Sequence, residues 1–330
     1  MKPAPITLAL TTGDPAGIGP EICAAAGQQL LNHNSQIRLH LYGDTSLFDH
    51  DFLNHPQVRL FHTPCAVPPI PGKPDAANAP YVTGLIEQAV THILSSQSQG
   101  QGQGQDQGQD QDQAQALVTA PIAKSVLYQA GFAFPGHTEF LGHLAGGVST
   151  HMMLASAALR VVPITLHQSL KSAIEDLSQE KIIAAVRAAH QGLKVHFGFD
   201  RPRLVICGLN PHAGENGTMG REDEDMIRPA VQSLRGEGID IRGPLPADTL
   251  FHAAARQTYD CALGLYHDQV LIPIKALAFD TGVNLTLGLP FVRTSPDHGT
   301  AFDIAGTGRA SSSSLLAAME MAAQMVAGAA

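Results

Sequence analysis

Three histidines of this chain each stand just past an apolar run that predicts a β-strand. His167 follows residues 157–166, His212 follows 204–211, and His267 follows 261–266. In open α/β sheets, ligands bind at the carboxyl ends of the strands, and neutral imidazole is the commonest protein ligand for zinc and similar ions. The three imidazoles can therefore converge on one divalent metal. Their placement permits this site without requiring it, because the chain has 16 histidines and three could reach strand ends by chance.

Other residues with chemical potential accompany these histidines. Asp268 directly follows His267, where its carboxylate could orient the imidazole, act as a base, or cap the next helix. Lys275 and Arg293 lie further along the chain, and cations near a metal favour an anionic substrate. Each cation taken singly is also typical of an ordinary surface charge. His137 stands where a helix is predicted to open, as a substrate ligand or a plain loop residue.

Three glycine-containing segments could approach a ligand through their backbone. Residues 13–21 follow the first predicted strand and open a helix, whose N-terminus can hold an anion. They form neither a GxGxxG fingerprint nor a Walker loop. Residues 210–217 place His212 in a sharp loop. The segment 221–225 follows, and its four carboxylates, at 222–225, suit a helix N-terminus. Residues 295–308 combine small residues with an aspartate in a way that suits close contact with a ligand.

Alternating strand and helix patterns must position these residues. Strands are predicted at 6–10, 37–42 and 116–119, and helices at 20–31, around 85–94, at 182–193 and at 311–330. This alternation predicts an α/β fold with a largely parallel sheet. Residues 95–115 carry glutamine at every odd position from 97, alternating with Gly, Asp and Ser, and predict a disordered surface insert.

Bulk properties limit the classes of protein. The chain has 330 residues, enough for two domains or one large one, and 44% hydrophobic against 15% charged residues allows a buried core. A net charge of −9 without a basic cluster argues against nucleic acid or an anionic membrane as the main partner. No apolar run reaches the roughly 18 residues of a membrane span, and no signal peptide is recognised. Four scattered cysteines favour reduced thiols in a cytoplasmic protein.

Several motifs together resemble one enzyme family. They lie at residues 13–21, 119–124, 134–139, 210–215, 243–248, 266–269 and 297–303. As a set they are highly specific, and they resemble the 4-hydroxythreonine-4-phosphate dehydrogenases from the first strand to about Arg309. The first and last motifs also resemble the wider isocitrate/isopropylmalate dehydrogenase superfamily, which binds NAD without a Rossmann fingerprint. The glutamine-rich insert departs from the family pattern.

The resemblance implies an architecture. It predicts two α/β/α lobes with largely parallel sheets and an active site in the cleft between them. Residues 1–130 and 300–330 would form a discontinuous first lobe that contains the insert. Residues 131–299 would form a second lobe, carrying the metal ligands and the contacts of a homodimer. The family's metal site is shared across the dimer, with one histidine crossing over.

The resemblance also implies residue roles. His167, His212 and His267 match the ligands of a divalent metal, which could be Zn, Mg or Co. Five residues match substrate-binding positions: His137, Thr138, Lys275, Asn284 and Arg293. Five more match the loop that contacts the nicotinamide cofactor, either NAD or NADP: His298, Gly299, Thr300, Ala301 and Asp303. Asp248 and Asp268 are both candidates for the proton acceptor.

The implied reaction is oxidation of 4-phosphooxy-L-threonine to 2-amino-3-oxo-4-phosphooxybutanoate. That product loses CO₂ to give 3-amino-2-oxopropyl phosphate in the synthesis of pyridoxine 5′-phosphate. One alternative is a dehydrogenase for a related four-carbon phosphorylated acid, such as threonate or erythronate 4-phosphate. The other is a non-catalytic, metal-dependent protein that binds a phosphorylated metabolite. The native metal, the choice between NAD and NADP, and the place of decarboxylation stay open.

Overall fold

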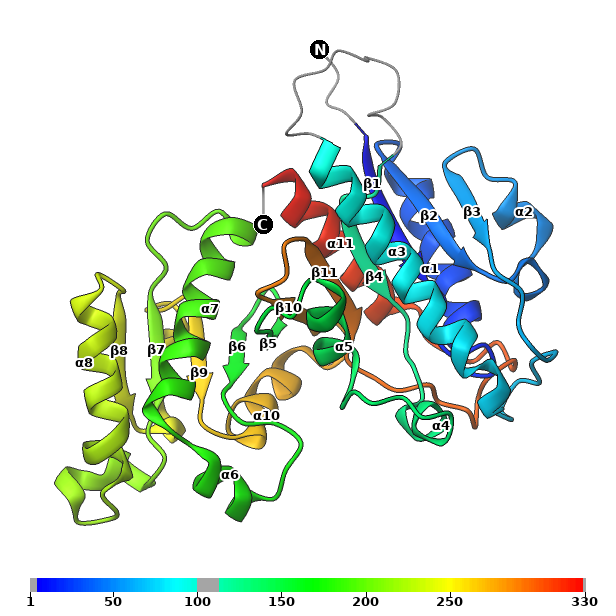
Figure 1. Ribbon diagram of the computed structural model, residues 1–330. Helices are drawn as coiled ribbons and strands as arrows, with labels where there is room; N and C mark the ends of the chain where they lie inside the picture. The colour runs from blue at the N-terminus through cyan, green and yellow to red at the C-terminus, as the bar shows by residue number, and fades with distance from the viewer. Residues whose placement is uncertain (1–4, 100–112, 329–330) are drawn as a thin grey trace. The chain divides into compact units, whose positions relative to one another are not determined.

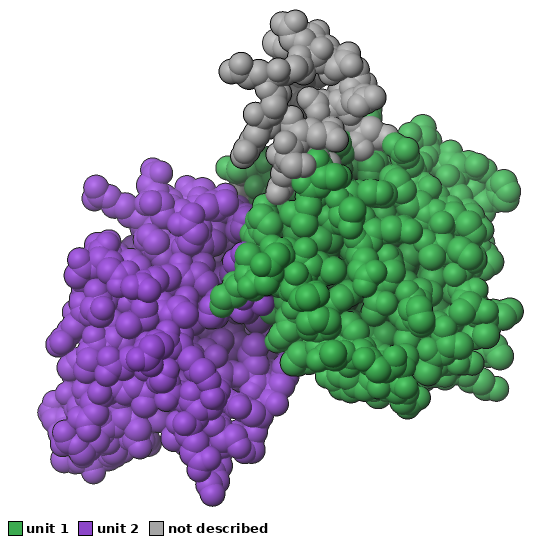
Figure 2. All heavy atoms as spheres, viewed as in Figure 1, with its two compact units in different colours: residues 1–149, 289–330 green, residues 150–288 purple. Residues whose placement is uncertain are grey.

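The computed structural model of the chain describes residues 5–99 and 113–328. The chain divides into two compact units, drawn in green and purple in Figure 2. Unit 1 comprises Met1–Ser149 and Leu289–Ala330, and unit 2 comprises Thr150–Gly288. The chain therefore builds unit 2 as one continuous segment inserted into the sequence of unit 1.

The sheet of unit 1 runs in the order β3-β2-β1-β4-β11, and its neighbouring strands are parallel. The strands are β1 (Ile6–Thr11), β2 (Ile37–Gly43), β3 (Val58–His62), β4 (Ala116–Thr119) and β11 (Val292–Pro296). In the central strand β1, Leu8 and Leu10 are fully buried. Such nearly continuous apolar sequence is typical of a parallel strand that is covered on both faces.

Helices cover both faces of this sheet (Figure 1). Helix α3 (Ala79–Gln99) packs on one face, where its Leu85 and Ala89 share a buried cluster with Ala9 of β1. Helices α1 (Gly19–His33) and α11 (Ser313–Ala327) contact each other and pack against the strands. The shorter helices are α2 (His50–Leu53), α4 (Lys124–Gln129) and α5 (His137–Leu144), with 3-10 turns at Thr45–Leu47 and Ala76–Asn78.

The sheet of unit 2 runs in the order β10-β5-β6-β9-β7-β8. The strands are β5 (His151–Ala155), β6 (Arg160–Pro163), β7 (Leu204–Cys207), β8 (Ile241–Leu245), β9 (Cys261–Gly264) and β10 (Val283–Leu287). From β6 to β8 the neighbouring strands are parallel, whereas β5 is antiparallel to both β10 and β6. The parallel part contains β6, β7 and β9, which the three predicted metal ligands follow.

Five helices complete unit 2. They are α6 (Leu170–Asp176), α7 (Gln179–Phe197), α8 (Arg228–Gly236), α9 (Ala253–Arg256) and α10 (His267–Ala278). In α7, the Ser178 side chain caps the N-terminus and Gly198, with a φ of 70°, ends the helix. Helix α10 packs on β6 and β9, where Val270 and Ile274 join the buried cluster of this unit.

The sequence-based expectations agree with these elements and differ in three places. Residues 131–149 belong to unit 1 because Phe140 and Leu141 of α5 pack into the α3 cluster. Residues 289–299 also belong to unit 1, since β11 pairs with β4. Helix α3 continues to Gln99, so the first residues of the expected insert are helical rather than irregular. Residues 100–112 of that segment lie outside the described residues.

Candidate functional site

Two of the predicted metal ligands lie side by side in unit 2. Strands β6, β9 and β7 are neighbours and parallel, so their carboxyl ends lie at the same edge of the sheet. His167 follows β6, and His267 is the first residue of α10 after β9. The centroids of their imidazole rings are 5.8 Å apart. Both residues line a cavity of about 490 Å³ together with Thr165, Tyr266 and Asp268.

Asp268 orients one of these rings. Its Oδ1 lies 2.6 Å from Nδ1 of His267, which leaves Nε2 of that ring available to a ligand. A carboxylate on the second ring nitrogen is the usual way in which proteins fix the tautomer of a metal-binding histidine. No side-chain cap occurs at the start of α10, so Asp268 does not cap this helix.

His212 does not join this pair within the chain. It lies on the exposed turn Pro211–Gly217, where residues 212–216 all have positive φ and His212 itself has a φ of 53°. Among the residues that the structure describes, no three His, Cys, Asp or Glu side chains form a metal-binding cluster. The donors present thus fit part of a divalent-metal site: two imidazoles, one of them oriented by a carboxylate.

Buried and partly buried hydrogen bonds join the strand ends that precede these histidines. Thr165 Oγ1 donates to the Leu265 carbonyl at 2.7 Å, which joins the end of β6 to the end of β9. The Gln269 side chain accepts from the Leu265 amide at 2.7 Å and donates to the Gly208 carbonyl at 2.8 Å. Gln269 therefore joins β9 to β7. Sequence reasoning quoted Gln269 only as part of a motif and assigned it no role.

Asp223 holds the start of the His212 loop. Its carboxylate is fully buried and accepts from the amides of Leu209 and Asn210 at 2.8 and 3.1 Å. The Asn210 side chain donates to it as well, at 3.0 Å. The acidic run 221–225 was predicted to act on a helix dipole. Asp223 does lie in the acidic first turn of a helical segment, the π-helical turn Asp223–Ile227 before α8, and it also binds the loop that follows β7.

Three further predicted residues of unit 2 lie on separate elements. Asp248 is exposed in the 3-10 turn Ala247–Thr249, and Lys275 is half-buried near the end of α10. Asn284 lies in β10, where its Oδ1 is buried and has no hydrogen-bond partner among the described residues. An orphaned buried acceptor of this kind fits a binding residue, because a ligand donor would satisfy it.

The substrate-binding residues predicted in unit 1 are largely enclosed. Arg293 in β11 is only 3% exposed, and its Nη2 donates to Thr119 Oγ1 of the neighbouring β4 at 2.6 Å. Burial lowers the pKa of the Arg293 guanidinium to about 9. His137 and Thr138 are the first two residues of α5. A bound anion would stabilise the charged form of Arg293, which burial disfavours.

His137 is the most perturbed histidine of this group. Burial, followed by the charges of Arg293 and Lys124, holds the pKa of His137 well below its usual range. Its Nε2 is buried and has no hydrogen-bond partner among the described residues. The ring is therefore neutral near pH 7, with one nitrogen that a ligand could satisfy. Lys124 lies in a motif recognised in the sequence, but no role was assigned to it there.

The predicted cofactor loop packs on the first glycine-rich loop of unit 1. The Ile18 amide donates to the Thr300 carbonyl at 3.0 Å, and a Cβ on Gly17 would come within 3.0 Å of Thr300. Glycine at position 17 thus allows this close approach without a shift of Thr300. Thr300 is nearly buried, Ala301 has a φ of 42°, and the other predicted residues, His298, Gly299 and Asp303, are exposed.

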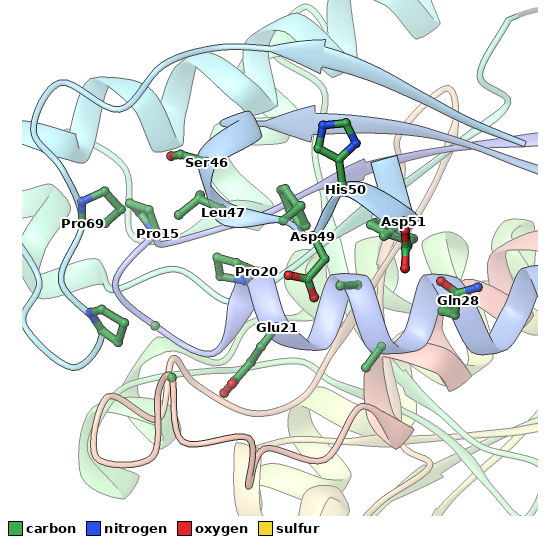
Figure 3. Close-up of a pocket in the computed structure, with 17 residues that line it drawn as sticks. Pro15, Pro20, Glu21, Gln28, Ser46, Leu47, Asp49, His50, Asp51 and Pro69 are labelled. Carbon is green, nitrogen blue, oxygen red and sulfur yellow. The ribbon is translucent and has the colours of Figure 1, made fainter. Parts of the chain in front are cut away.

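A cavity of about 890 Å³ adjoins these loops (Figure 3). Pro15, Gly17 and Glu21 line it from the first loop and α1, Asp49 lines it from the segment before α2, and Gly306 lines it from the last loop. Its volume is within the usual range for small-molecule and cofactor pockets. Its acidic side chains suit hydroxyl groups better than phosphates.

The chain is similar to known dehydrogenases over nearly its whole length. The profile of the family described as "Pyridoxal phosphate biosynthetic protein PdxA" matches residues 105–322. A 4-hydroxythreonine-4-phosphate dehydrogenase of Bradyrhizobium diazoefficiens is 47% identical over 353 residues, with 97% of each chain covered. The crystal structure of the enzyme of that name from Klebsiella pneumoniae superposes with a TM-score of 0.82 at 34% identity, covering 97% of this chain and 99% of the other.

A more distant structure shares the same fold. It is a terephthalate 1,2-cis-dihydrodiol dehydrogenase from Burkholderia xenovorans LB400, with a TM-score of 0.67 at 28% identity over 96% of this chain and 97% of the other. The fold and these similarities define the protein as an α/β dehydrogenase. More particularly, the chain belongs to the 4-hydroxythreonine-4-phosphate dehydrogenase family. Searching its described helices for one long and apolar enough to span a membrane finds none.

Proposed function

We propose that this dehydrogenase oxidises 4-phosphooxy-L-threonine with NAD or NADP in the synthesis of pyridoxine 5′-phosphate. The product, 2-amino-3-oxo-4-phosphooxybutanoate, then decarboxylates to 3-amino-2-oxopropyl phosphate. The observation that carries the proposal is the 47% identity, over 97% of both chains, to a protein named for this activity. The side chains described above are consistent with that chemistry.

His167 and His267 would hold one divalent metal, Zn, Mg or Co, because their rings are 5.8 Å apart and Asp268 orients one of them. A bound divalent cation supplies Lewis-acid polarisation of the substrate oxygen. His212 lies outside the pair within one chain. We propose that it completes the ligand set in a homodimer, where a histidine from one copy serves the site of the other.

Five residues would bind the anionic and polar groups of the substrate: His137, Thr138, Lys275, Asn284 and Arg293. Arg293 is buried and already oriented by Thr119, so it loses little side-chain entropy on binding. Asn284 offers a buried Oδ1 to a substrate donor such as an ammonium group. These groups would orient the substrate so that its C3 hydrogen leaves as hydride to the nicotinamide ring.

A carboxylate would accept the proton of the C3 hydroxyl. Asp268 is engaged with His267 at 2.6 Å, which favours an orienting role for it. Asp248 is exposed on the turn after β8, and it is the better candidate for the proton acceptor. The cofactor would contact the loop that contains His298, Gly299, Thr300, Ala301 and Asp303, next to the glycine-rich loop after β1.

The direct test is the near-ultraviolet absorbance of reduced nicotinamide, with purified protein, NAD or NADP, and either zinc or magnesium. Signal with 4-phosphooxy-L-threonine that disappears after chelation supports the proposal. If signal occurs only with D-threonate 4-phosphate or D-erythronate 4-phosphate, the substrate assignment is wrong and the reaction class is kept. The similarity to a dihydrodiol dehydrogenase of the same fold makes this second candidate worth testing, since the fold accommodates more than one substrate.

We further propose a cytoplasmic location. All four cysteines are free thiols, and Cys23, Cys207 and Cys261 are buried. Burial raises the pKa of each of these three thiols, which keeps them protonated and unreactive. Such thiols are typical of proteins in a reducing compartment.

A further inference from the structure

Lys124 lies against Gly136, the residue that precedes the half-buried His137. It is the first residue of α4, after β4, and the end of its side chain lies next to Gly136. A Cβ on Gly136 would come within 3.1 Å of the Lys124 Cε and 3.2 Å of its Nζ. Glycine at this position therefore lets the ammonium group approach the start of α5. Among the described residues, Lys124 has no ion pair within 4.0 Å. The Oε2 atom of the exposed Glu139 would lie 3.5 Å from the same Cβ on Gly136.

Lys124 and Arg293 act on the same imidazole. Both of their charges lower the pKa of His137, in addition to the effect of burial. The two cations thus lie near one neutral ring whose buried Nε2 has no partner among the described residues. Arg293 is buried in β11, whereas Lys124 is exposed. The group therefore has one enclosed cation, one accessible cation and one unsatisfied nitrogen.

From this geometry we infer that Lys124 binds the phosphate group of the substrate, together with His137 and Arg293. The inference rests on the proposed function for the identity of the substrate, but not for the presence of an anion site. A phosphate monoester carries nearly two negative charges at neutral pH, which match one lysine and one arginine. The neutral imidazole can donate from Nε2 to a third oxygen in the tautomer that protonates this atom.

A carboxylate fits this group less well. Its single charge is balanced by one guanidinium, which binds both oxygens in a bidentate pair. A second cation and a further donor would then remain without a partner near the same ring. Phosphate has more oxygens to share among three donors, and a lysine commonly contacts it as a point charge.

The test compares Lys124→Gln and Lys124→Arg with the unaltered protein. Glutamine removes the charge and keeps most of the stem, while arginine keeps the charge. We expect Lys124→Gln to raise the KM for 4-phosphooxy-L-threonine by roughly tenfold to a hundredfold, the usual effect of losing a charge-assisted hydrogen bond. The KM of the cofactor and the affinity for metal should stay within about twofold, and Lys124→Arg should recover part of the loss.

Inorganic phosphate provides a readout that does not depend on turnover. Calorimetric titration should show weaker phosphate binding in Lys124→Gln than in the unaltered protein. The matched control is Lys194→Gln on α7, an exposed lysine of unit 2, which should change neither measurement. Oxidation of the unphosphorylated 4-hydroxy-L-threonine should be insensitive to Lys124→Gln, since that compound lacks the phosphate group that Lys124 is proposed to bind.

The results separate this inference from the proposed function. If 4-phosphooxy-L-threonine is not oxidised but phosphate binding still depends on Lys124, the substrate assignment fails and the anion site stands. Unchanged phosphate affinity and unchanged substrate KM in Lys124→Gln would overturn the inference. A rise in the cofactor KM alone would also overturn it, because the lysine would then serve a cofactor phosphate.

Discussion

The candidate anion-binding residues of unit 1 and the candidate metal ligands of unit 2 lie in opposite surroundings. In unit 1, Arg293 is 3% exposed and the Nε2 atom of His137 is buried. In unit 2, His167 and His212 are exposed at strand ends, and the His267 side chain is 38% exposed. Burial in unit 1 changes the ionisation of the side chains themselves. In unit 2, hydrogen bonds fix the position of the backbone segments that carry the exposed rings.

This difference indicates two ways to prepare a binding group. A buried cation is disfavoured until an anion arrives, so burial makes a site selective for negative charge. An exposed imidazole is accessible to a metal from solvent and needs the correct direction. Asp268 supplies that direction for one ring, and Gln269 and Asp223 fix the strand ends and the loop.

The largest effect is expected from removing an exposed imidazole. His267→Ala, and likewise His212→Ala, should abolish metal binding and lower turnover by at least about a thousandfold, because Lewis-acid stabilisation of developing charge is worth several kcal/mol. Metal content after dialysis and steady-state rates are the measurements. The fold should be retained, as judged by circular dichroism, and His33→Ala at the exposed end of α1 is the control. Full metal content in His267→Ala would remove this residue from the metal site.

A large effect is also expected in the buried group. Arg293→Ala should raise the substrate KM by about a hundredfold, since truncating one partner of a buried charge pair costs about 2–5 kcal/mol. The substrate KM of Arg293→Lys should lie between those of Arg293→Ala and the unaltered protein, because lysine keeps the charge and loses the bidentate guanidinium group. Metal affinity should not change in either variant. If the substrate KM were unchanged in Arg293→Ala, the arginine would be a packing residue of β11 only.

An intermediate effect is expected from the carboxylate that orients His267. Asp268→Asn should weaken metal binding by roughly tenfold to a hundredfold, the usual effect of losing such an outer partner. Competition with a chromophoric chelator measures the affinity. Added metal should restore much of the activity if Asp268 only orients the ring. Failure of excess metal to restore it would instead identify Asp268 as the proton acceptor.

A smaller effect is expected from the Gln269 side chain, which joins β9 to β7 and is called the brace. Gln269→Leu leaves the Leu265 amide and the Gly208 carbonyl without their side-chain partner, at a cost of about 1–3 kcal/mol in unfolding free energy. Metal affinity should fall as well, because the residues before His267 and His212 lose their link. Gln191→Leu on α7 is the matched control. A loss of stability with unchanged metal affinity would show that the brace is structural alone.

The smallest effect is a pH dependence of stability. The pKa of His137 is lowered in the folded state, so below its ordinary value near 6.5 the unfolded chain binds a proton that the folded chain does not. Folding stability should therefore fall as pH decreases through this range, and His137→Gln should remove this one contribution. Urea unfolding of both proteins at about pH 7.5 and about pH 5.5 measures it. If both proteins lost the same unfolding free energy between these pH values, the burial of a neutral His137 ring would be contradicted.

Much of the architecture could be predicted from local pattern. The apolar runs of β1, β2 and β4 and the periodicity of α1, α3 and α7 are properties of neighbouring residues, and the alternation of these elements predicts an α/β fold. The division of the chain was harder to predict. It depends on Phe140 and Leu141 packing with α3 and on β11 pairing with β4, which are contacts between residues far apart in sequence.

By itself, the sequence determined the types of side chain available for chemistry and the strand ends that carry them. It also determined the family, because several motifs occur together. Only the tertiary structure decided which of these side chains meet. It brings His167 and His267 together but leaves His212 apart, it encloses Arg293 beside Thr119, and it reveals Lys124 near His137. The physical reason is that burial and proximity arise from packing between distant segments, which no local pattern records.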